Sequence, residues 1–248
     1  MLKPEGMIQR TAETVEKKTL PQEFGLLCWN VHKENDQIRF EKHFEILLQQ
    51  YKIDLIALQE VKINVSKRSI FDKFHLSLAP NMKFFNNIYG VLIGSYTPEI
   101  STFPLLSMHK ESFIQTHKSA IFSSYLLHNG KILLLVNLHA INFRRTKIYN
   151  KEIDLITETV RHHEGPLIIA GDFNSWNRKR IETLKSFTRL LRLHSITMNH
   201  GHLVKSFMRH KLDHIFYRGL KLQESHVIDT AQYSDHNALY VRFTSIVL

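Results

Sequence analysis

The sequence predicts an α/β (α+β) fold in which two mixed β-sheets pack against each other and helices cover their outer faces. Short apolar runs of strand length alternate with stretches whose apolar residues follow helical spacing. The dipeptide Asn129-Gly130 lies between two apolar runs and is a strong hairpin signal, which excludes a purely parallel sheet. A length of 248 residues and a hydrophobic share of 43% fit one large domain. We place that domain at 23–248, after an N-terminal arm at 1–22.

Strands and helices alternate in the first half of the chain. FGLLCWNV at 24–31 predicts a buried strand, and Asn35 or Asp36 can cap the helix whose apolar stripe runs from Phe40 to Tyr51. DLIAL at 54–58 predicts a second strand. Beyond it we expect a helix at 66–78, a strand at 84–95 and, at 96–116, connecting chain or edge strands.

The second half opens with the predicted hairpin of 120–127 and 131–138. A helical stripe from Tyr149 to Val160 follows, and Gly165-Pro166 ends it. The most apolar short run, at 167–170, predicts a central buried strand. A helix over 181–191 and closing strands at 212–217, 220–228 and 238–243 complete the chain.

Composition and charge narrow the partners. A single cysteine, Cys28, excludes a disulfide framework. The net charge of +10 favours polyanions such as nucleic acid, phosphorylated small molecules or anionic lipid headgroups. No apolar stretch approaches the roughly 18 residues of a membrane span, and the first twenty residues lack the apolar centre of a signal peptide. We therefore expect a cytoplasmic monomer without an obligate protein partner.

Residues drawn from Asn, Asp, Glu and His recur at the ends of the predicted strands. They are Asn30, Glu60, His139, Asp172, Asn174, Asp213, Asp235 and His236. In covered sheets, ligands gather beyond the carboxyl ends of the strands, so we expect these side chains to share one site. Asp172 and Asn174 are two residues apart, which places them on the same side of an extended chain.

This set of side chains points to phosphate chemistry. Carboxylate oxygens are hard ligands that suit Mg²⁺ or Mn²⁺, and no compact His/Cys spacing indicates zinc. His139 and His236 can act as acid and base near neutral pH, and Asp213 can orient one of them. A cation, a carboxylate and a pair of imidazoles together indicate hydrolysis of a phosphate ester. The sequence leaves open which histidine is the acid.

Six motifs resemble those of the endonuclease/exonuclease/phosphatase superfamily. They are WNVH at 29–32, LQEV at 58–61, NLHA at 137–140, GDFN at 171–174, LDHIF at 212–216 and SDHNAL at 234–239. They occur in the family order and extend over about 25–243, and HAINF at 139–143 with AGDFNSWNRKR at 170–180 resembles a poorly characterised bacterial branch. The resemblance implies a DNase I-like, four-layer sandwich and divalent-metal-dependent hydrolysis of phosphate esters.

The resemblance also implies roles for individual residues. Glu60 would be the principal metal ligand, with Asn30 beside it and Asp235 contributing. Asp172 would orient or deprotonate the attacking water, and Asn174 would hold that water or a phosphate oxygen. Asp213 and His236 would form a carboxylate–imidazole pair, and His139 would contact the scissile phosphate or act as the acid.

Substrate contacts are expected from residues near these motifs. Lys62 follows LQEV, where DNase I-like nucleases have a DNA-contacting arginine, and we assign it to the substrate with Asn142, Arg144 and Arg178. Basic clusters at 144–147, 178–180 and 205–211 would surround the site with positive charge. Trp176 could stack on a base or anchor its loop. Exonuclease III-like repair enzymes carry a tyrosine where this chain has His139, which weakens an assignment to abasic-site repair.

Three functional hypotheses remain open from the sequence. The leading one is a DNase I-like nuclease that cleaves DNA or RNA with Mg²⁺ or Mn²⁺. The second is a phosphatase or phospholipase C-type enzyme of the same fold, acting on an inositol phosphate or on sphingomyelin. The third is a non-catalytic nucleic-acid-binding module, which the complete set of acids and imidazoles disfavours.

Overall fold

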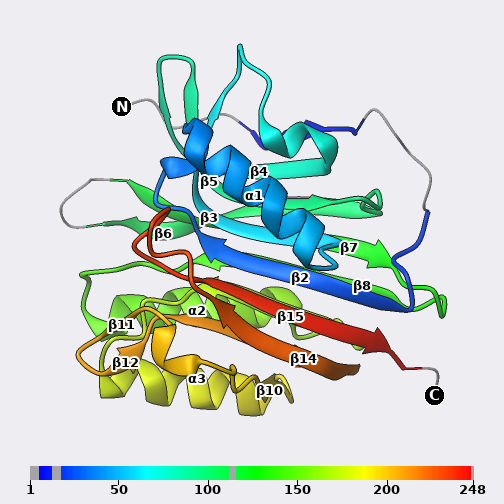
Figure 1. Ribbon diagram of the computed structural model, residues 1–248. Helices are drawn as coiled ribbons and strands as arrows, with labels where there is room; N and C mark the ends of the chain where they lie inside the picture. The colour runs from blue at the N-terminus through cyan, green and yellow to red at the C-terminus, as the bar shows by residue number, and fades with distance from the viewer. Residues whose placement is uncertain (1–5, 13–17, 112–115, 247–248) are drawn as a thin grey trace.

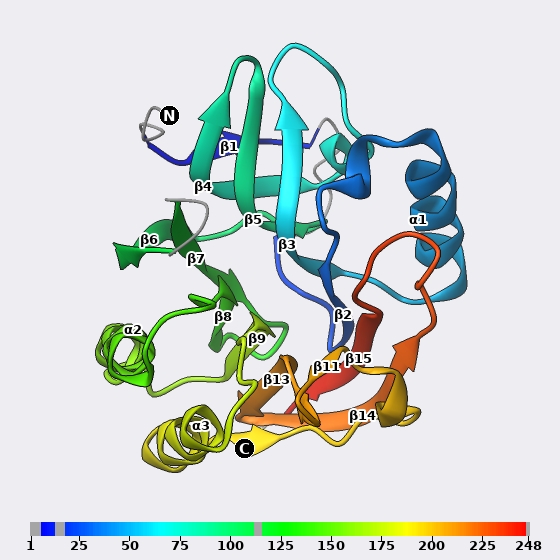
Figure 2. The same cartoon turned by 90° about the vertical axis from the view of Figure 1, so that its left-hand side faces the viewer.

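The computed structural model describes residues 6–12, 18–111 and 116–246. Within these residues, a seven-stranded and a six-stranded sheet pack face to face, and helices cover both outer faces (Figures 1 and 2). Both sheets contain parallel and antiparallel neighbours. This arrangement confirms the predicted sandwich of two mixed sheets.

Each sheet has a defined strand order. The seven-stranded sheet runs β1 (Ile8–Arg10), β4 (His75–Phe84), β5 (Asn87–Ser95), β3 (Leu55–Asn64), β2 (Glu23–Asn30), β15 (Ala238–Ser245), β14 (Leu220–Ile228). The six-stranded sheet runs β10 (His194–Ser195), β13 (Asp213–Arg218), β9 (Leu167–Asp172), β8 (Ile132–His139), β7 (His117–Leu126), β6 (Ser101–Lys110). A small ribbon joins β11 (Ser206–Phe207) to β12 (His210–Lys211).

Three apolar clusters hold the layers together. The first fills the space between the sheets, where Cys28 and Ala57 of one sheet share a cluster with Leu135 and Ala170 of the other. The second lies under α1 (Ile38–Gln50), and the third lies under α2 (Thr146–Val160) and α3 (Arg178–Leu190). Short 3₁₀ turns occur at Glu34–Asp36, Ile70–Lys73 and Gly201–Leu203. The helices therefore form the two outer layers of the sandwich.

A parallel pair lies in the middle of each sheet. In one sheet β2 pairs with β3, with Asn30 opposite Gln59, and in the other β8 pairs with β9, with His139 opposite Asp172. β2, β8 and β9 end at one edge of the sandwich, where ligands bind in covered sheets, and β3 passes that edge at Gln59 and Glu60 before it ends at Asn64. That edge carries the predicted site.

The helix predicted at 66–78 is wrong. Ser69 caps only a single 3₁₀ turn, Ile70–Lys73, and the chain then enters β4 at His75. Leu76 and Leu78 follow the two-residue period of a strand, which the helical spacing of the preceding aromatic residues obscured. The strand expected at 84–95 is confirmed over Asn87–Ser95, which form β5, whereas Phe84 is the last residue of β4.

The two least regular stretches of the sequence both join the sheets. Within 96–116, where we expected connecting chain or edge strands, β6 forms an edge strand. Residues 112–115 lie outside the described residues. In the arm at 1–22, β1 pairs with β4 and the buried Leu20 bridges to Leu127; residues 1–5 and 13–17 lie outside the description. Among the described helices, none has the length and apolar character needed to cross a membrane.

Candidate active site

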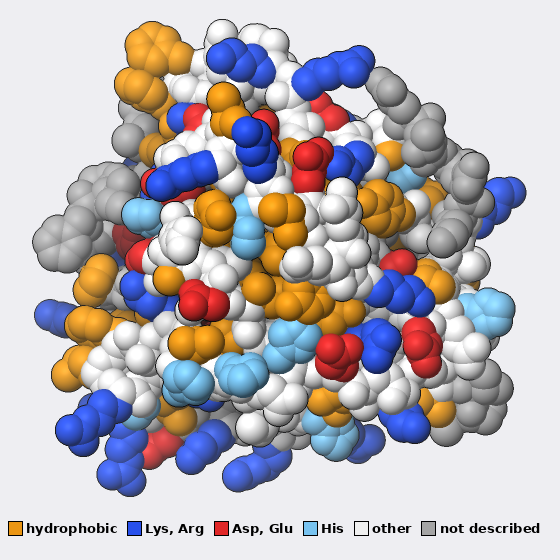
Figure 3. Space-filling view, viewed as in Figure 1, with side chains coloured by type: hydrophobic (Ala, Val, Ile, Leu, Met, Phe, Trp, Pro, Cys, Tyr) orange, Lys and Arg blue, Asp and Glu red, His pale blue; other side chains and the backbone are white. Residues whose placement is uncertain are grey.

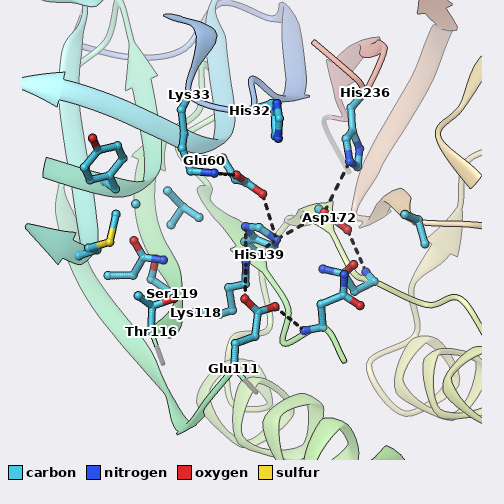
Figure 4. Close-up of a pocket in the computed structure, with 18 of the residues that line it drawn as sticks. His32, Lys33, Glu60, Glu111, Thr116, Lys118, Ser119, His139, Asp172 and His236 are labelled. Atoms are coloured by element: carbon cyan, nitrogen blue, oxygen red, sulfur yellow. Dashed lines mark hydrogen bonds and ion pairs between the residues drawn. The ribbon is translucent and has the colours of Figure 1, made fainter. Parts of the chain in front are cut away.

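A pocket of about 420 Å³ opens at the edge where β2, β8 and β9 end and where β3 bulges at Glu60 (Figure 4). Seven of the predicted site residues line it: Glu60, His139, Asn142, Asp172, Asn174, Asp235 and His236. Asn30 and Asp213 support this group from behind, through hydrogen bonds to Asp172 and His236. The structure thus brings together the strand-end residues that the sequence singled out.

Glu60 owes its position to an irregularity in β3. The pairing of β3 with β5 shifts register between Leu58 and Val61, and Glu60 adopts a φ of 53°. Such a bulge redirects a side chain, and here it turns the carboxylate into the pocket. Burial opposes ionisation of Glu60, but the basic groups around it, including Lys118 and Lys33, hold its pKa below the usual range. The ammonium of Lys33 contacts the carboxylate directly, so Glu60 already holds a cation.

His139 occupies the centre of the group in Figure 4. Its Nε2 lies 3.5 Å from Oδ2 of Asp172 and 3.9 Å from Oε1 of Glu60. Nζ of Lys118 lies 3.0 Å from the same nitrogen, and because an ammonium can only donate, Nε2 accepts and carries no proton. Burial and the charge of Lys118 lower the pKa of His139 well below its ordinary value. His139 is therefore a neutral imidazole.

Lys118 and Glu111 are site residues that sequence reasoning missed. Lys118 projects from β7 beneath His139, and its Nζ also lies 3.4 Å from Oε2 of Glu111 (Figure 4). Glu111 accepts a hydrogen bond from the backbone N–H of Asn142, 3.1 Å away, which ties it to the loop after β8. The only signal in the sequence was a lysine two residues before the apolar run at 120–127.

Asp172 lies at the end of β9 and is held from two sides. Its Oδ2 accepts from the side-chain amide of Asn30 at 3.2 Å, and its Oδ1 accepts from the backbone N–H of Asn174 at 2.9 Å. Burial, together with the nearby charge of Asp213, raises the pKa of Asp172 to about 7. Gly171 precedes it with a φ of 142°, and a Cβ there would lie 1.9 Å from the carbonyl oxygen of Leu138. Only glycine lets the backbone of β9 approach β8 this closely.

Asp213 and His236 form the predicted carboxylate–imidazole pair. Nδ1 of His236 lies 2.8 Å from Oδ2 of Asp213, and Nε2 points into the pocket, 4.0 Å from Oδ2 of Asp172. Burial opposes protonation of His236, but the surrounding carboxylates outweigh it and raise its pKa to about 9. The indole of Trp29 donates to the carbonyl oxygen of His236, which fixes the backbone of this loop. His236 is therefore an imidazolium at neutral pH.

Asn30 and Asp235, both predicted beside the metal, have other contacts. Oδ1 of Asn30 accepts from the backbone N–H of His32, while its amide nitrogen donates to Asp172. Asp235 lies at the rim of the pocket, where Nζ of Lys205 is 3.0 Å from its Oδ2. Asn30 thus orients Asp172, and Asp235 forms an ion pair with a pocket lysine.

Three of the four predicted substrate residues lie outside the pocket. Lys62 pairs with Asp36, and Arg144 donates through Nε to the carbonyl oxygen of Lys110. The Arg178 side chain is 89% exposed and pairs with Glu182 one helical turn away. Asn142 does line the pocket, as expected. Among the described residues, the lysines that line the pocket are instead Lys33, Lys118 and Lys205.

Arg180, expected in a basic cluster at the rim, is completely buried. Its Nη1 donates to the carbonyl oxygens of Ile141 and Asn174, and its Nη2 donates to that of Arg144. The guanidinium lies 4.9 Å from the ring of Trp176, whose indole N–H donates to Oδ1 of Asn142. Arg180 and Trp176 therefore join the loop after β8 to the loop after β9.

The donor set suits a divalent cation. Asp172, Asp213 and His236 offer ligand atoms that all lie within 4.8 Å of one another, and Glu60 adds a carboxylate already in contact with an ammonium. Oδ1 of Asp213 is buried and accepts no hydrogen bond from any described residue. Oxygen-rich groups of this kind fit Mg²⁺ or Mn²⁺ better than softer metals.

Sequence comparison agrees with this geometry. A sequence model of the Endonuclease/Exonuclease/phosphatase family matches residues 27–236. A UPF0294 protein of Erwinia tasmaniensis is 34% identical over 224 residues, covering 88% of this chain and 80% of the relative. A UPF0294 protein of Photorhabdus laumondii is 34% identical over 229 residues, covering 89% and 84%.

Solved structures share the fold at low sequence identity. An endonuclease/exonuclease/phosphatase family protein from Leptotrichia buccalis superposes with a TM-score of 0.66 at 18% identity, covering 89% of this chain and 99% of that one. The catalytic domain of human Nocturnin, solved with a bound sulfate anion, gives a TM-score of 0.68 at 17% identity and covers 91% and 96%. At these identities the likeness establishes the fold alone.

Proposed function

The chain belongs to the endonuclease/exonuclease/phosphatase family, and from that membership we propose that it is a divalent-metal-dependent phosphoesterase that cleaves phosphodiester bonds in nucleic acid. One observation carries the proposal. Glu60, His139, Asp172 and His236, from four separate segments of the chain, converge on one pocket, with neighbouring charged or polar atoms 3.5–4.0 Å apart. A scissile phosphate placed among them would meet acid, base and cation site together.

The two histidines take different roles in this proposal. His236 is an imidazolium that can donate from Nε2 to a phosphate or leaving-group oxygen, and Asp213 holds its ring in place through Nδ1. His139 is neutral, and Lys118 is hydrogen-bonded to it, so the lysine brings positive charge to the floor of the pocket. The imidazolium of His236 and the ammonium of Lys118 both stabilise the negative charge that develops on phosphate oxygens in the transition state.

Asp172 is the group that accepts the proton of the attacking water in this proposal. Its pKa of about 7 lies near a physiological working pH, where a general base combines availability with proton affinity. Asn30 and the backbone of Asn174 each hold one of its oxygens, which fixes the direction of the remaining lone pairs. Asn174 is held in turn through its amide nitrogen, which donates to the carbonyl oxygen of Ala140.

We place the divalent cation at Glu60, where Lys33 shows that the carboxylate accepts a positive charge. Asp172 and the unpaired oxygen of Asp213 are further ligand candidates. A bound Mg²⁺ or Mn²⁺ would neutralise charge on the phosphate and lower the pKa of water.

A second candidate is a phosphatase or phospholipase C-type activity of the same fold. The placement of the cations favours it: Lys62 and Arg178 do not line the pocket, whereas Lys33, Lys118 and Lys205 do. Cations concentrated in one pocket fit a single phosphorylated head group as well as they fit a polymer. The proposal otherwise retains the monomeric state and cytoplasmic location expected from the sequence, which sedimentation and cell fractionation would test.

The deciding experiment is a matrix of metals and substrates with metal-stripped protein. Mg²⁺ and Mn²⁺ are each tested with plasmid DNA, single-stranded DNA and RNA oligonucleotides, an inositol phosphate and sphingomyelin. We expect oligonucleotide cleavage without release of inorganic phosphate, lost in His236→Ala and retained in Arg178→Met. Release of inorganic phosphate from the inositol phosphate, or of phosphocholine from sphingomyelin, would establish the second candidate. Binding of nucleic acid with no turnover of any substrate would overturn both.

A further inference from the structure

The hairpin between β4 and β5 carries the most exposed large apolar side chain of the described residues. Phe85 is 80% exposed, and the neighbouring Phe84 is 56% exposed. Their rings contact each other edge to face, with centroids 4.6 Å apart. Val65 is 44% exposed, and its backbone N–H donates to the carbonyl oxygen of Asn86, which brings the turn after β3 alongside this hairpin. We call Val65, Phe84 and Phe85 the apolar tip.

The backbone of the turn makes a phenylalanine here unusual. Phe84 pairs with Asn87, so Phe85 and Asn86 form a two-residue hairpin loop, and Phe85 has a φ of 50°. Positions with positive φ in such loops favour glycine, because a Cβ is strained in the left-handed region. The backbone at Phe85 is therefore strained, although its aromatic ring is exposed to solvent.

Positive charge surrounds the apolar tip. The two segments that form it, 61–70 and 80–90, contain Lys62, Lys67, Arg68 and Lys83 and no acidic residue, and of these Lys62 is paired with Asp36. Figure 3 shows hydrophobic side chains at the upper edge of the molecule, over the β4–β5 hairpin of Figure 1, with Lys and Arg side chains beside them. Exposed aromatic rings flanked by cations match a surface that is apolar inside and negatively charged outside.

The apolar tip also stands close to the active site. Asn81, Met82 and Tyr89, from the same two strands, line the pocket. A strand rises about 3.3 Å per residue, so the tip lies on the order of 10 Å beyond them. The apolar tip therefore lies near the rim of the pocket.

We propose that the apolar tip docks this protein on an anionic lipid surface, with Phe84 and Phe85 entering the interface and Lys67 and Lys83 contacting the headgroups. This docking goes beyond the proposed activity and does not depend on it. A single-stranded nucleic acid stacked on the phenylalanines is the competing occupant. The lipid surface is favoured because the two rings pack edge to face against each other, leaving a wedge rather than a row of parallel faces.

Vesicle co-sedimentation tests the docking without any catalytic readout. Full-length protein is mixed with vesicles of phosphatidylcholine alone, or of phosphatidylcholine with phosphatidylglycerol. We expect binding to the anionic vesicles that weakens with salt, and a loss of about tenfold or more in the Phe84→Ser/Phe85→Ser variant. The matched control is Leu190→Ser/Ile132→Ser, which removes two exposed apolar side chains from other parts of the surface and should bind like the wild type.

A second variant keeps the experiment decisive if the double serine variant folds poorly. Phe85→Gly removes the ring at a backbone position that suits glycine, so its melting temperature should equal or exceed that of the wild type while vesicle binding falls. Equal vesicle binding by wild type and Phe85→Gly, or no binding of the wild type to anionic vesicles at low salt, would overturn the proposal. Weakened binding of a single-stranded oligonucleotide by Phe85→Gly, with vesicle binding unchanged, would assign the tip to nucleic acid instead.

Discussion

His236 and Asp213 are joined by a 2.8 Å contact between Nδ1 and Oδ2, although 23 residues separate them in the sequence. Both side chains are buried, and the free Nε2 of the ring faces Asp172 across 4.0 Å. A protonated imidazole therefore lies between two carboxylates, one paired with it and one able to exchange protons with solvent or substrate. The pH dependence of the reaction follows from this arrangement.

The first prediction concerns the alkaline limb of the activity profile. The pKa of His236 is raised to about 9 against the opposing effect of burial, and Asp213 is the largest cause of that increase. In Asp213→Asn, the pKa of His236 should fall, so kcat/KM should decline at a lower pH than in the wild type. His236→Ala should lower kcat by roughly 10²–10⁴-fold, the usual contribution of a general acid. The measurement is kcat/KM from pH 5.5 to 10, with the exposed Asp154→Asn as control.

An alkaline limb that stays in place in Asp213→Asn would show that His236 is not the acid. A move of the acidic limb alone would point to Asp172, whose pKa of about 7 governs that side of the profile. The two outcomes separate the two groups because their pKa values lie on opposite sides of the expected optimum.

The second prediction concerns the metal. If the cation binds at Glu60, Glu60→Gln should raise the Mg²⁺ concentration for half-maximal activity by at least about 10–100-fold, the cost typical even of outer-shell changes. Lys33→Met should act in the opposite direction, because it removes the ammonium that now contacts the carboxylate. Titration of Mg²⁺ against activity, with calorimetry on the same variants, measures both. A larger effect of Asp213→Asn than of Glu60→Gln would move the metal to the group of Asp172, Asp213 and His236.

The sequence predicted the strand-end residues because two simple rules combine there. Apolar runs marked β2, β3, β8 and β9, and a polar residue directly after such a run must lie at the edge of the sheet. The superfamily motifs added roles that geometry alone does not assign. Neither rule identifies Lys118, because the sequence around a lysine beside an apolar strand is the same whether its side chain points to solvent or into a pocket.

Packing between distant elements could not be predicted in the same way. Gln59 and Asn137 meet between the sheets, where the amide of Gln59 donates to Oδ1 of Asn137 at 2.6 Å and Asn137 donates to the carbonyl oxygen of Leu58. This bridge sets the two sheets against each other directly below Glu60 and His139. The sequence placed Gln59 and Asn137 within the motifs LQEV and NLHA but could not show that they meet, because their contact depends on how the sheets face each other.

The third prediction contrasts two arginines that the sequence could not rank. Arg178 and Arg180 begin the same helix, and the helical turn sends the first into solvent and the second into the protein. Arg180→Met would leave the carbonyl oxygens of Ile141, Asn174 and Arg144 without their donor, so the free energy of unfolding should fall by roughly 2–5 kcal/mol. Arg178→Met should change it by no more than about 0.5 kcal/mol.

Arg180 should also affect activity through position alone. It joins the loops that carry Asn142 and Asn174, and displacement of such loops by about 1 Å can cost on the order of 100-fold in rate. We expect kcat to fall in Arg180→Lys while the pH profile keeps its shape. A shifted profile would show that Arg180 acts on the charge of Asp172 rather than on the loops.

The last prediction concerns the contribution of the His236–Asp213 pair to the stability of the folded protein. The pKa of His236 in the folded protein, about 9, lies above its ordinary value of 6.5, so its contribution is complete below pH 6.5 and is lost as the pH rises through 9. The shift corresponds to about 3 kcal/mol. The raised pKa of Asp172 changes the stability in the same direction, because the stability that it contributes is lost as the pH rises from 3.8 through about 7.

The free energy of unfolding from urea titrations should therefore fall between pH 6.5 and 9.5 in the wild type. His236→Gln should be less stable than the wild type at pH 6.5, because Asp213 loses its charged partner, and the two proteins should converge above pH 9. Parallel curves across this range would mean that His236 is neutral in the folded protein, and that its contact with Asp213 is an uncharged hydrogen bond.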